Sequence, residues 1–216
     1  MGKHVEYRPE WVREDFIDFL AEKVNPLWAW KKAKARIVAK HHLSDDFVYM
    51  QLQPNHHFKA TDYQAGQSIL VTVLIAGVRW QRSYSIVEIL ENGNLVIAVK
   101  QQGKVSNALT QQPVKSVVEI SQTQGEFVLK SQPHSALMIA SGSGITAIYA
   151  LIKAALKRPQ TVSNIDLIYF TRDDAFHAEL KSLVEHYPQF KYHHVNTRTH
   201  KQHLSQDLLS QKIEGF

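Results

Sequence analysis

The hydrophobic pattern changes along the chain. Apolar residues over 9–24 recur at helical spacing and end at Asn25-Pro26, which predicts a short amphipathic helix. Over 35–132, short runs rich in valine and isoleucine alternate with turn residues, as in antiparallel strands of a small β-barrel. Over 133–216, apolar strands alternate with helical patterns, which predicts a parallel sheet with helices on its faces.

The pattern therefore predicts two folded parts after a helical N-terminal extension over 1–34. A glycine turn and brief helix over 103–109 interrupt the strands of the barrel. The predicted barrel runs are 35–43, 47–54, 67–75, 79–89, 94–101, 116–122 and 126–130, and the later strands are 136–141, 164–171 and 191–198, with helices over 145–156, 174–187 and from about 205 to 213.

Composition narrows the class of protein. The chain has 216 residues, 44% hydrophobic and 21% charged, which is globular composition. A net charge of +5 favours an anionic partner, whether nucleic acid, a phosphorylated cofactor, an acidic protein or a lipid surface. The absence of cysteine excludes disulfides and any thiolate-held zinc or iron–sulfur cluster bound by this chain alone. Without an apolar spanning run or an export signal, we expect a cytoplasmic protein.

Two further kinds of site can be considered from the sequence, a metal site at paired histidines and an interface at paired tryptophans. Adjacent histidines at 41–42, 56–57 and 193–194 point to opposite faces of a strand, so no such pair chelates one ion directly, and we expect no metal. The segment 27–36, LWAWKKAKAR, places two tryptophans beside four cations. This composition fits a membrane interface or a segment folded back over a domain.

A glycine turn follows the strand at 136–141. Gly142, Gly144 and Ala147 give a formal G-x-G-x-x-A match before a helix, where unpaired N–H groups favour a phosphate. This motif usually includes an acidic residue about 20 positions later, at the end of the second strand, that holds the ribose hydroxyls. Neither candidate fits well, because Asp166 lies at the start of that strand and Asp173 lies at its end but further along the sequence than the usual spacing. A tight turn in an α/β protein remains the alternative.

A second group of polar residues lies in the predicted barrel. Arg82 and Tyr84 project to one face of a strand, and Ser83 and Ser85 project to the other. A phosphate on the guanidinium would leave the phenol ring beside it to stack on a planar heterocycle, which suits a flavin or another nucleotide. The turn over 103–106 adds N–H groups at a helix start for a pyrophosphate.

The ordered motifs resemble those of the ferredoxin–NADP reductase superfamily. They are AGQS at 65–68, RSYS at 82–85, KQQGKVSNAL at 100–109, GEF at 125–127 and ASGSGIT at 140–146. The resemblance implies an antiparallel six-stranded flavin-binding barrel over 35–132 and an incomplete NADP-binding α/β domain over 133–216. The N-terminal segment 25–39 is similar to bacterial flavin reductases that pass electrons to ferredoxin-like partners and onward to membrane fatty-acid desaturases.

The resemblance also implies roles for individual residues. Arg82 would hold the flavin phosphate, Tyr84 would pack on the isoalloxazine, and Ser85 would hydrogen-bond near N5, so Tyr84 and Ser85 are the expected catalytic residues. The implied FAD-binding residues are Arg82, Ser83, Tyr84, Ser85, Val99, Lys100, Gly103, Lys104, Val105, Ser106 and Asn107.

The pyridine nucleotide would lie on the second domain. Thr197-Arg198 resembles the hydroxyl–arginine pair that receives a 2′-phosphate, with Arg172 as a second candidate, so we expect NADPH rather than NADH. The implied nucleotide-binding residues are Gly142, Ser143, Gly144, Ile145, Thr146, Arg172, Thr197 and Arg198.

The resemblance implies an oxidoreductase that takes hydride from NADPH onto FAD and passes single electrons to a ferredoxin-like acceptor. The chain departs from the family at Ser141 and Ala147, and it ends before the cysteine-glycine-proline strand end and the C-terminal aromatic residue. We therefore expect a C-terminally truncated reductase, with a further strand and helix beyond Phe216. Two alternatives remain: a flavin-binding module without turnover, and a basic nucleic-acid-binding barrel.

Overall fold

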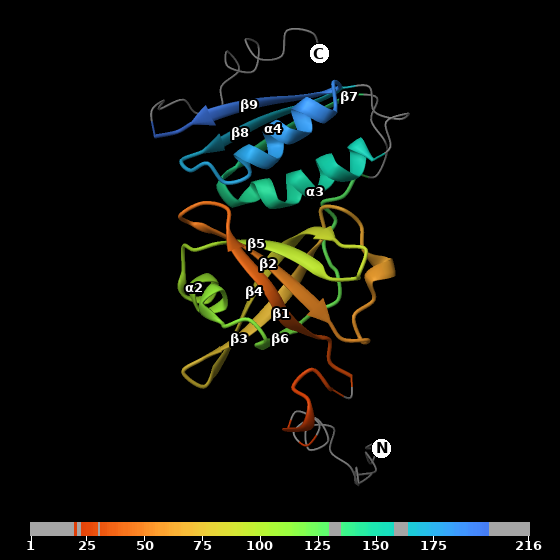
Figure 1. Ribbon diagram of the computed structural model, residues 1–216, viewed down its shortest axis with the longest axis vertical. Coiled ribbons are helices and arrows are strands. Elements are labelled where there is room, and N and C mark those ends of the chain that lie inside the picture. Colours follow the sequence, from red (N-terminus) through yellow and green to blue (C-terminus); the bar gives the residue numbers. More distant parts are fainter. Residues whose placement is uncertain (1–19, 21–22, 30, 130–134, 158–163, 199–216) are drawn as a thin grey trace, which may run out of the picture.

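The structure is a computed structural model that describes residues 20, 23–29, 31–129, 135–157 and 164–198 (Figure 1). These residues form a closed antiparallel barrel of six strands and a separate parallel sheet of three strands. The predicted fold class is confirmed. Most of the helix expected over 9–24, and the helix start expected beyond residue 204, lie outside the described residues.

The barrel is built from short strands whose inward side chains form one apolar core. Its strands neighbour one another in the order β1-β2-β5-β4-β3-β6, and β6 pairs with both β1 and β3 to close it. A two-residue turn at Ala76-Gly77, with both φ values positive, sets the β3–β4 register. The elements are β1 (Lys34–His42), β2 (Phe47–Pro54), η1 (Ala60–Asp62), β3 (Ser68–Ile75), β4 (Val78–Ile89), β5 (Leu95–Lys100), α2 (Lys104–Gln111) and β6 (Val117–Ile120).

The seventh predicted barrel strand, over 126–130, is wrong. Residues 126–129 contain no strand, and the Val128 N–H donates to the Glu126 carbonyl in a tight local turn. Only an isolated bridge joins Gln124 to Ser68 before this segment. Because β6 already closes the barrel on both sides, no free edge is left there for another strand.

The second part alternates strands and helices as predicted. Its sheet order is β7-β8-β9, all parallel. Helix α4 begins three residues later than predicted, because Phe176 adopts a left-handed φ of 65° while its ring is buried. Among the described residues, no helix is long and apolar enough to cross a membrane. The elements are β7 (Ser135–Ser141), η2 (Gly142–Gly144), α3 (Ile145–Leu156), β8 (Asn164–Thr171), α4 (His177–His186) and β9 (Phe190–Asn196).

Helix α3 lies between the sheet and the barrel (Figure 1). The two parts share one apolar cluster, in which the Phe47 ring of the barrel meets the Phe176 ring edge-on at 6.1 Å, and Tyr149 lies 5.1 Å from Phe176. Glu88 of β4 forms an ion pair with Lys153 of α3. Burial of apolar surface and this ion pair together hold the sheet against the barrel.

Candidate functional site

The barrel opens between β4 and β5. Strand β4 pairs with β3 along residues 78–85, but its ladder with β5 covers only Ile86 to Ile89 and contains a bulge between Ile86 and Glu88. Beyond that point, Ala98–Lys100 of β5 pair with β2. The edge of β4 at residues 82–85 therefore lies outside the β4–β5 ladder, and its backbone groups are placed to meet a ligand.

A cavity of about 460 Å³ lies along this opening. It joins residues predicted to bind FAD to residues of the glycine turn of the second sheet. This volume lies within the range of about 300–1,000 Å³ usual for ligand sites. Its lining residues are Trp80, Arg82, Ser83, Tyr84, Ser85, Ala98, Lys100, Gln102, Gly103, Lys104, Val105, Ser106, Ser143, Gly144 and Thr146.

Arg82 and Tyr84 both line the cavity. The Arg82 side chain is exposed and donates one bond, from Nη1 to the Gln81 carbonyl at 2.8 Å, which leaves guanidinium donors for a phosphate. Burial raises the pKa of the half-buried Tyr84 phenol to about 12, against the opposing effect of Arg82. Tyr84 therefore stays neutral at physiological pH and offers an uncharged ring.

Ser83 and Ser85 follow the predicted alternation. They oppose Leu70 and Ser68 in the β3–β4 register, and the Ser83 hydroxyl donates to the Ser68 hydroxyl at 2.8 Å. Ser85 lines the cavity although Tyr84 points to the other face. The open edge of β4 explains how both residues reach the same space, because a ligand that meets the edge contacts neighbours of either face.

The turn before α2 is suited to a phosphate. The Ser106 hydroxyl accepts from the N–H groups of Gln102 and Gly103 at 3.2 and 3.1 Å and donates to the Gly103 carbonyl, so it orders the turn. The first intrahelical donor is the Asn107 N–H, and the N–H groups of 104–106 therefore face outward from the helix start. A Cβ added at Gly103 would meet nothing within 4 Å, so space remains there for a diphosphate.

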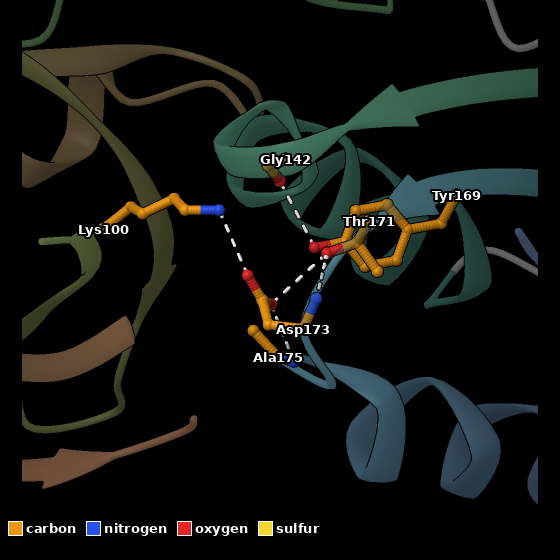
Figure 2. Close-up of polar contacts among 6 residues, drawn as sticks. All are labelled: Lys100, Gly142, Tyr169, Thr171, Asp173 and Ala175. Carbon is orange, nitrogen blue, oxygen red and sulfur yellow. Dashed lines mark hydrogen bonds and ion pairs between the residues drawn. The ribbon is translucent and has the colours of Figure 1, made fainter. Parts of the chain in front are cut away.

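The glycine turn after β7 is fixed by hydrogen bonds that its carbonyl groups accept from Tyr169 and Thr146. Gly142 has a left-handed φ of 51°, and the buried Tyr169 hydroxyl donates to its carbonyl at 3.2 Å (Figure 2). Thr146 donates to the Ser143 carbonyl at 3.0 Å. Ser143, Gly144 and Thr146 line the cavity, whereas Gly142 and the buried Ile145 do not. The Ile145 side chain therefore packs in the core, and Ile145 bears on the site only as the first residue of α3.

An ion pair crosses between the two parts of the site. The Lys100 ammonium at the end of β5 lies 3.1 Å from Asp173 Oδ2 in the loop after β8 (Figure 2). The other carboxylate oxygen accepts from the Ala175 N–H at 3.1 Å and from the Thr171 hydroxyl at 3.3 Å. Both side chains are largely buried, at 17% and 8% exposed. Sequence reasoning identified both residues but not their contact, because 73 positions separate them.

A second cavity, of about 570 Å³, lies at the carboxyl ends of β8 and β9. Arg172, Thr197 and Arg198 line it together with Asp46, so the three residues predicted to hold a 2′-phosphate are brought together. The Thr197 N–H donates to the Thr171 carbonyl at 2.9 Å, which fixes this end of β9 beside β8. Lys100 and Gln102 line both cavities, which therefore adjoin.

Other predicted residues lie elsewhere. Val99 is fully buried in the barrel core, and neither it nor Asn107 lines the first cavity. Asp166 is buried at the start of β8, 3.5 Å from His193, far along the strand from the nucleotide edge. Among the residues that the structure describes, no group of three or more histidine or acidic side chains is placed to hold a metal ion.

Trp80 lines the first cavity but was not identified as a site residue in the sequence. It lies on the strand face of Arg82 and Tyr84, and this alternation at 80, 82 and 84 was a readable signal. The Lys104 ammonium lies 4.4 Å from the centre of its ring. The wall of the cavity therefore continues past Arg82 as an aromatic surface with a cation over it.

Comparison with known families agrees with this arrangement. Residues 34–129 match the oxidoreductase FAD-binding domain, and residues 138–214 match the oxidoreductase NAD-binding domain. The chain is thus an oxidoreductase with an FAD-binding and a pyridine-nucleotide-binding domain. These two domains, in this order, are the pair expected from the resemblance to the ferredoxin–NADP reductase superfamily. This class disfavours the nucleic-acid-binding alternative.

Individual relatives carry different functions. An NADPH oxidoreductase of Mycobacterium tuberculosis is 30% identical over 186 residues, which cover 81% of this chain and 48% of that protein. An NADH-cytochrome b5 reductase 1 of Mortierella alpina is 26% identical, with 81% of this chain and 61% of the relative covered. The chain spans about half the length of the first of these relatives.

Solved structures share the fold. A ferredoxin NADP+ reductase of Neisseria gonorrhoeae with bound FAD and NADP has a TM-score of 0.71 at 19% identity, covering 86% of this chain and 78% of that chain. The cytochrome b5 reductase domain of Ulva prolifera nitrate reductase has a TM-score of 0.66 at 24% identity, covering 76% and 72%.

Proposed function

We propose that this chain takes electrons from NADPH through FAD and passes them singly to a protein acceptor such as a ferredoxin. The observation that carries the proposal is the first cavity. Its wall combines Tyr84, Ser85 and Lys100 of the barrel with Ser143 and Gly144 of the glycine turn. A flavin held by the barrel would therefore face a nucleotide held by the second sheet, and the two reacting rings would meet without a diffusing carrier.

The barrel residues would orient the flavin. Arg82 would bind the phosphate, and the outward N–H groups at the start of α2 would bind the pyrophosphate. The open edge of β4 would hydrogen-bond the polar edge of the ring system, with Ser85 near N5. When bound, FAD supplies the exchange between a two-electron donor and a one-electron acceptor.

Two roles follow from burial. A phenol is neutral near pH 7 even at its ordinary pKa of about 10, and burial raises the pKa of Tyr84 further, so its ring would pack on the flavin without adding a charge beside it. Lys100 would keep an ammonium at the wall common to both cavities, since Asp173 holds it there. The ammonium, although paired with Asp173, would attract the phosphates of a bound nucleotide toward that wall.

The second cavity supports NADPH over NADH. Arg172 and Arg198 bring two guanidiniums, and Thr197 brings a hydroxyl, to one space at the carboxyl edge of the sheet. Asp46 also lines this cavity and would oppose a 2′-phosphate, but the two guanidiniums outnumber it, and the nearby Asp173 carboxylate is engaged by Lys100 and by the Ala175 N–H. The guanidiniums are thus the more available groups for that phosphate.

The segment before β1 supports an interface role. Its backbone is held on the barrel, because Asn55 and Lys34 donate to the carbonyls of Leu27 and Trp28 at 3.2 Å each. The Trp28 side chain is nevertheless 54% exposed. We propose that this surface meets the electron acceptor or a membrane desaturase system, for which the net charge of +5 favours an acidic partner.

An anaerobic titration tests the proposal. Purified protein loaded with FAD is titrated with NADPH and with NADH while the visible flavin absorbance is recorded. A ferredoxin and cytochrome c are then added to detect single-electron transfer. We expect NADPH to bleach the flavin at lower concentration than NADH, and cytochrome c reduction to depend on the ferredoxin.

Three outcomes would contradict the proposal at different points. A protein that takes up no flavin removes the flavin site. A yellow protein that neither nucleotide bleaches is a binding module without turnover. Bleaching that is equally efficient with both nucleotides removes the NADPH assignment and leaves the reductase activity standing.

A further inference from the structure

Trp80 and Lys104 lie at one end of the first cavity, beyond the groups assigned to the flavin ring and the diphosphate. The Lys104 ammonium lies 4.4 Å from the centre of the indole ring. The indole Nε1 is buried and has no hydrogen-bond acceptor among the described residues. The part of Trp80 that faces the cavity is therefore ring carbon, which suits stacking rather than hydrogen bonding.

The order of side chains along β4 matches the order of groups in FAD. Tyr84, Arg82 and Trp80 lie on one strand face, and alternate residues are spaced by about 7 Å at ~3.3 Å per residue. In FAD the isoalloxazine is followed by the ribityl chain, the diphosphate and then adenosine. With the ring at Tyr84 and the diphosphate at Arg82, the adenine comes next to Trp80.

Lys104 is placed to leave the Trp80 ring and bind a diphosphate instead. It is the first residue of α2, so its stem begins at the turn assigned to the diphosphate. Its side chain is exposed, and a cation–π contact at an exposed site is weak. A diphosphate would attract the ammonium more strongly than the indole does, and the ring would then be uncovered.

We propose that Trp80 is the stacking platform for the adenine of FAD, and that Lys104 moves from the indole to the diphosphate when the cofactor binds. This inference rests on the flavin placement proposed above. FMN ends at its first phosphate and cannot reach Trp80. The pair therefore makes the site selective for the dinucleotide over the mononucleotide.

The test compares the two flavins on the apoprotein. Dissociation constants for FAD and FMN are measured by flavin fluorescence for the unmodified chain, Trp80→Leu, Trp80→Phe and Val78→Ala. We expect Trp80→Leu to weaken FAD about tenfold, equivalent to ~1.4 kcal/mol and within the range for stacking of a base on an aromatic side chain. FMN should change by less than about twofold, since it makes no contact with the indole.

The control variants separate stacking from disturbance of the strand. Trp80→Phe keeps an aromatic face and should retain most of the preference for FAD. Val78→Ala changes an exposed residue on the same strand face, two positions further from the cavity, and should leave both affinities unaltered. If Trp80→Leu weakens both flavins equally, or neither, the adenine platform is wrong.

Arg82→Ala distinguishes this inference from the flavin placement itself. Because both flavins carry the phosphate assigned to Arg82, both should bind less tightly in this variant. If neither affinity changes, the placement fails; if both fall while Trp80→Leu leaves the FAD-to-FMN ratio unaltered, only the inference fails.

A second measurement does not depend on Trp80→Leu folding. Adenosine diphosphate has no isoalloxazine to take energy from the indole, so it should quench the Trp80 emission of the unmodified protein, obtained as the difference from Trp80→Phe, whereas ribose 5-phosphate should not. Adenosine diphosphate that competes with FAD but leaves the Trp80 emission unaltered would contradict the proposal.

Discussion

The Lys100 ammonium lies 3.1 Å from the Asp173 carboxylate, and this contact joins the last residue of β5 to the loop after β8 (Figure 2). Like the apolar cluster shared by the barrel and α3, this ion pair joins the barrel to the second part of the structure. Because both side chains are largely buried, the removal of either one leaves an uncompensated charge in a region with little water.

Asp173→Asn should lower the free energy of unfolding by about 2–3 kcal/mol, somewhat less than for a fully buried pair. Urea unfolding of the apoprotein measures the change. A double-mutant cycle with Lys100→Met should give a coupling above about 1 kcal/mol. Lys157→Met is the control, since Lys157 is 3.9 Å from Glu88 and 68% exposed; its cost should stay below about 0.5 kcal/mol. A coupling near zero would show that the pair does not link the domains.

Gly66 should tolerate no side chain. Its φ is +94°, and an added Cβ would lie 2.0 Å from the Phe127 carbonyl oxygen and 3.0 Å from Leu151 of α3. Gly66→Ala should therefore cost more than about 3 kcal/mol, through strain and displacement of backbone at the domain contact. Thermal unfolding measures it.

Gly77→Ala supplies the comparison for Gly66→Ala. Gly77 has a similar φ of +77°, but an added Cβ meets nothing within 4 Å. The cost should then be the conformational one alone, about 1 kcal/mol. Similar losses in the two variants would mean that the close approach at Gly66 carries no extra energy.

Arg198→Gln tests nucleotide choice. The loss of a guanidinium from the second cavity should raise the apparent Kd for NADPH about 10- to 100-fold, the range expected for a hydrogen bond to a charged group, and should change NADH by less than about threefold. Anaerobic flavin bleaching gives both constants. Arg79→Gln is an exposed control in the barrel, where Arg79 pairs with Glu119. Equal losses for the two nucleotides would remove Arg198 from the 2′-phosphate site.

His194 should make the fold less stable in acid. Burial and the neighbouring His177 lower the pKa of His194, against the opposing effects of Asp174 and Asp173. The folded protein therefore favours the neutral ring, and the unfolded chain binds more protons below its ordinary pKa of about 6.5. The contribution is present above that pH and is lost as the pH falls through it toward the lowered folded value.

His194→Gln should flatten this dependence. The free energy of unfolding of the two proteins is compared between about pH 5 and pH 7.5, on either side of the ordinary histidine pKa. His186→Gln, at the exposed end of α4, is the control. An unchanged slope in His194→Gln would assign the acid sensitivity to other groups.

Much of the fold was predictable because local pattern and global pairing agree. The alternation in β4 and the helical spacing in α3 match the elements found. The run at 126–130 was misassigned because its composition suits a strand but the barrel offers it no partner edge. Pairing depends on distant segments, so a short window does not contain that information.

The sequence predicted individual residues of the site, but it did not predict which of them contact one another. Arg82, Tyr84 and Gly103 are recognisable from residue type and strand or turn position, and all three line one cavity. The contact of Lys100 with Asp173 and the aromatic end at Trp80 required coordinates. They depend on how β5, β8 and α2 approach one another, which no local motif specifies.

The unpaired stretch of β4 also bears on how the protein behaves without cofactor. A strand edge with unsatisfied backbone groups is a template that another polypeptide can extend. A flavin seated there would cover that edge. Loading with FAD would then lower the tendency of the apoprotein to self-associate along β4.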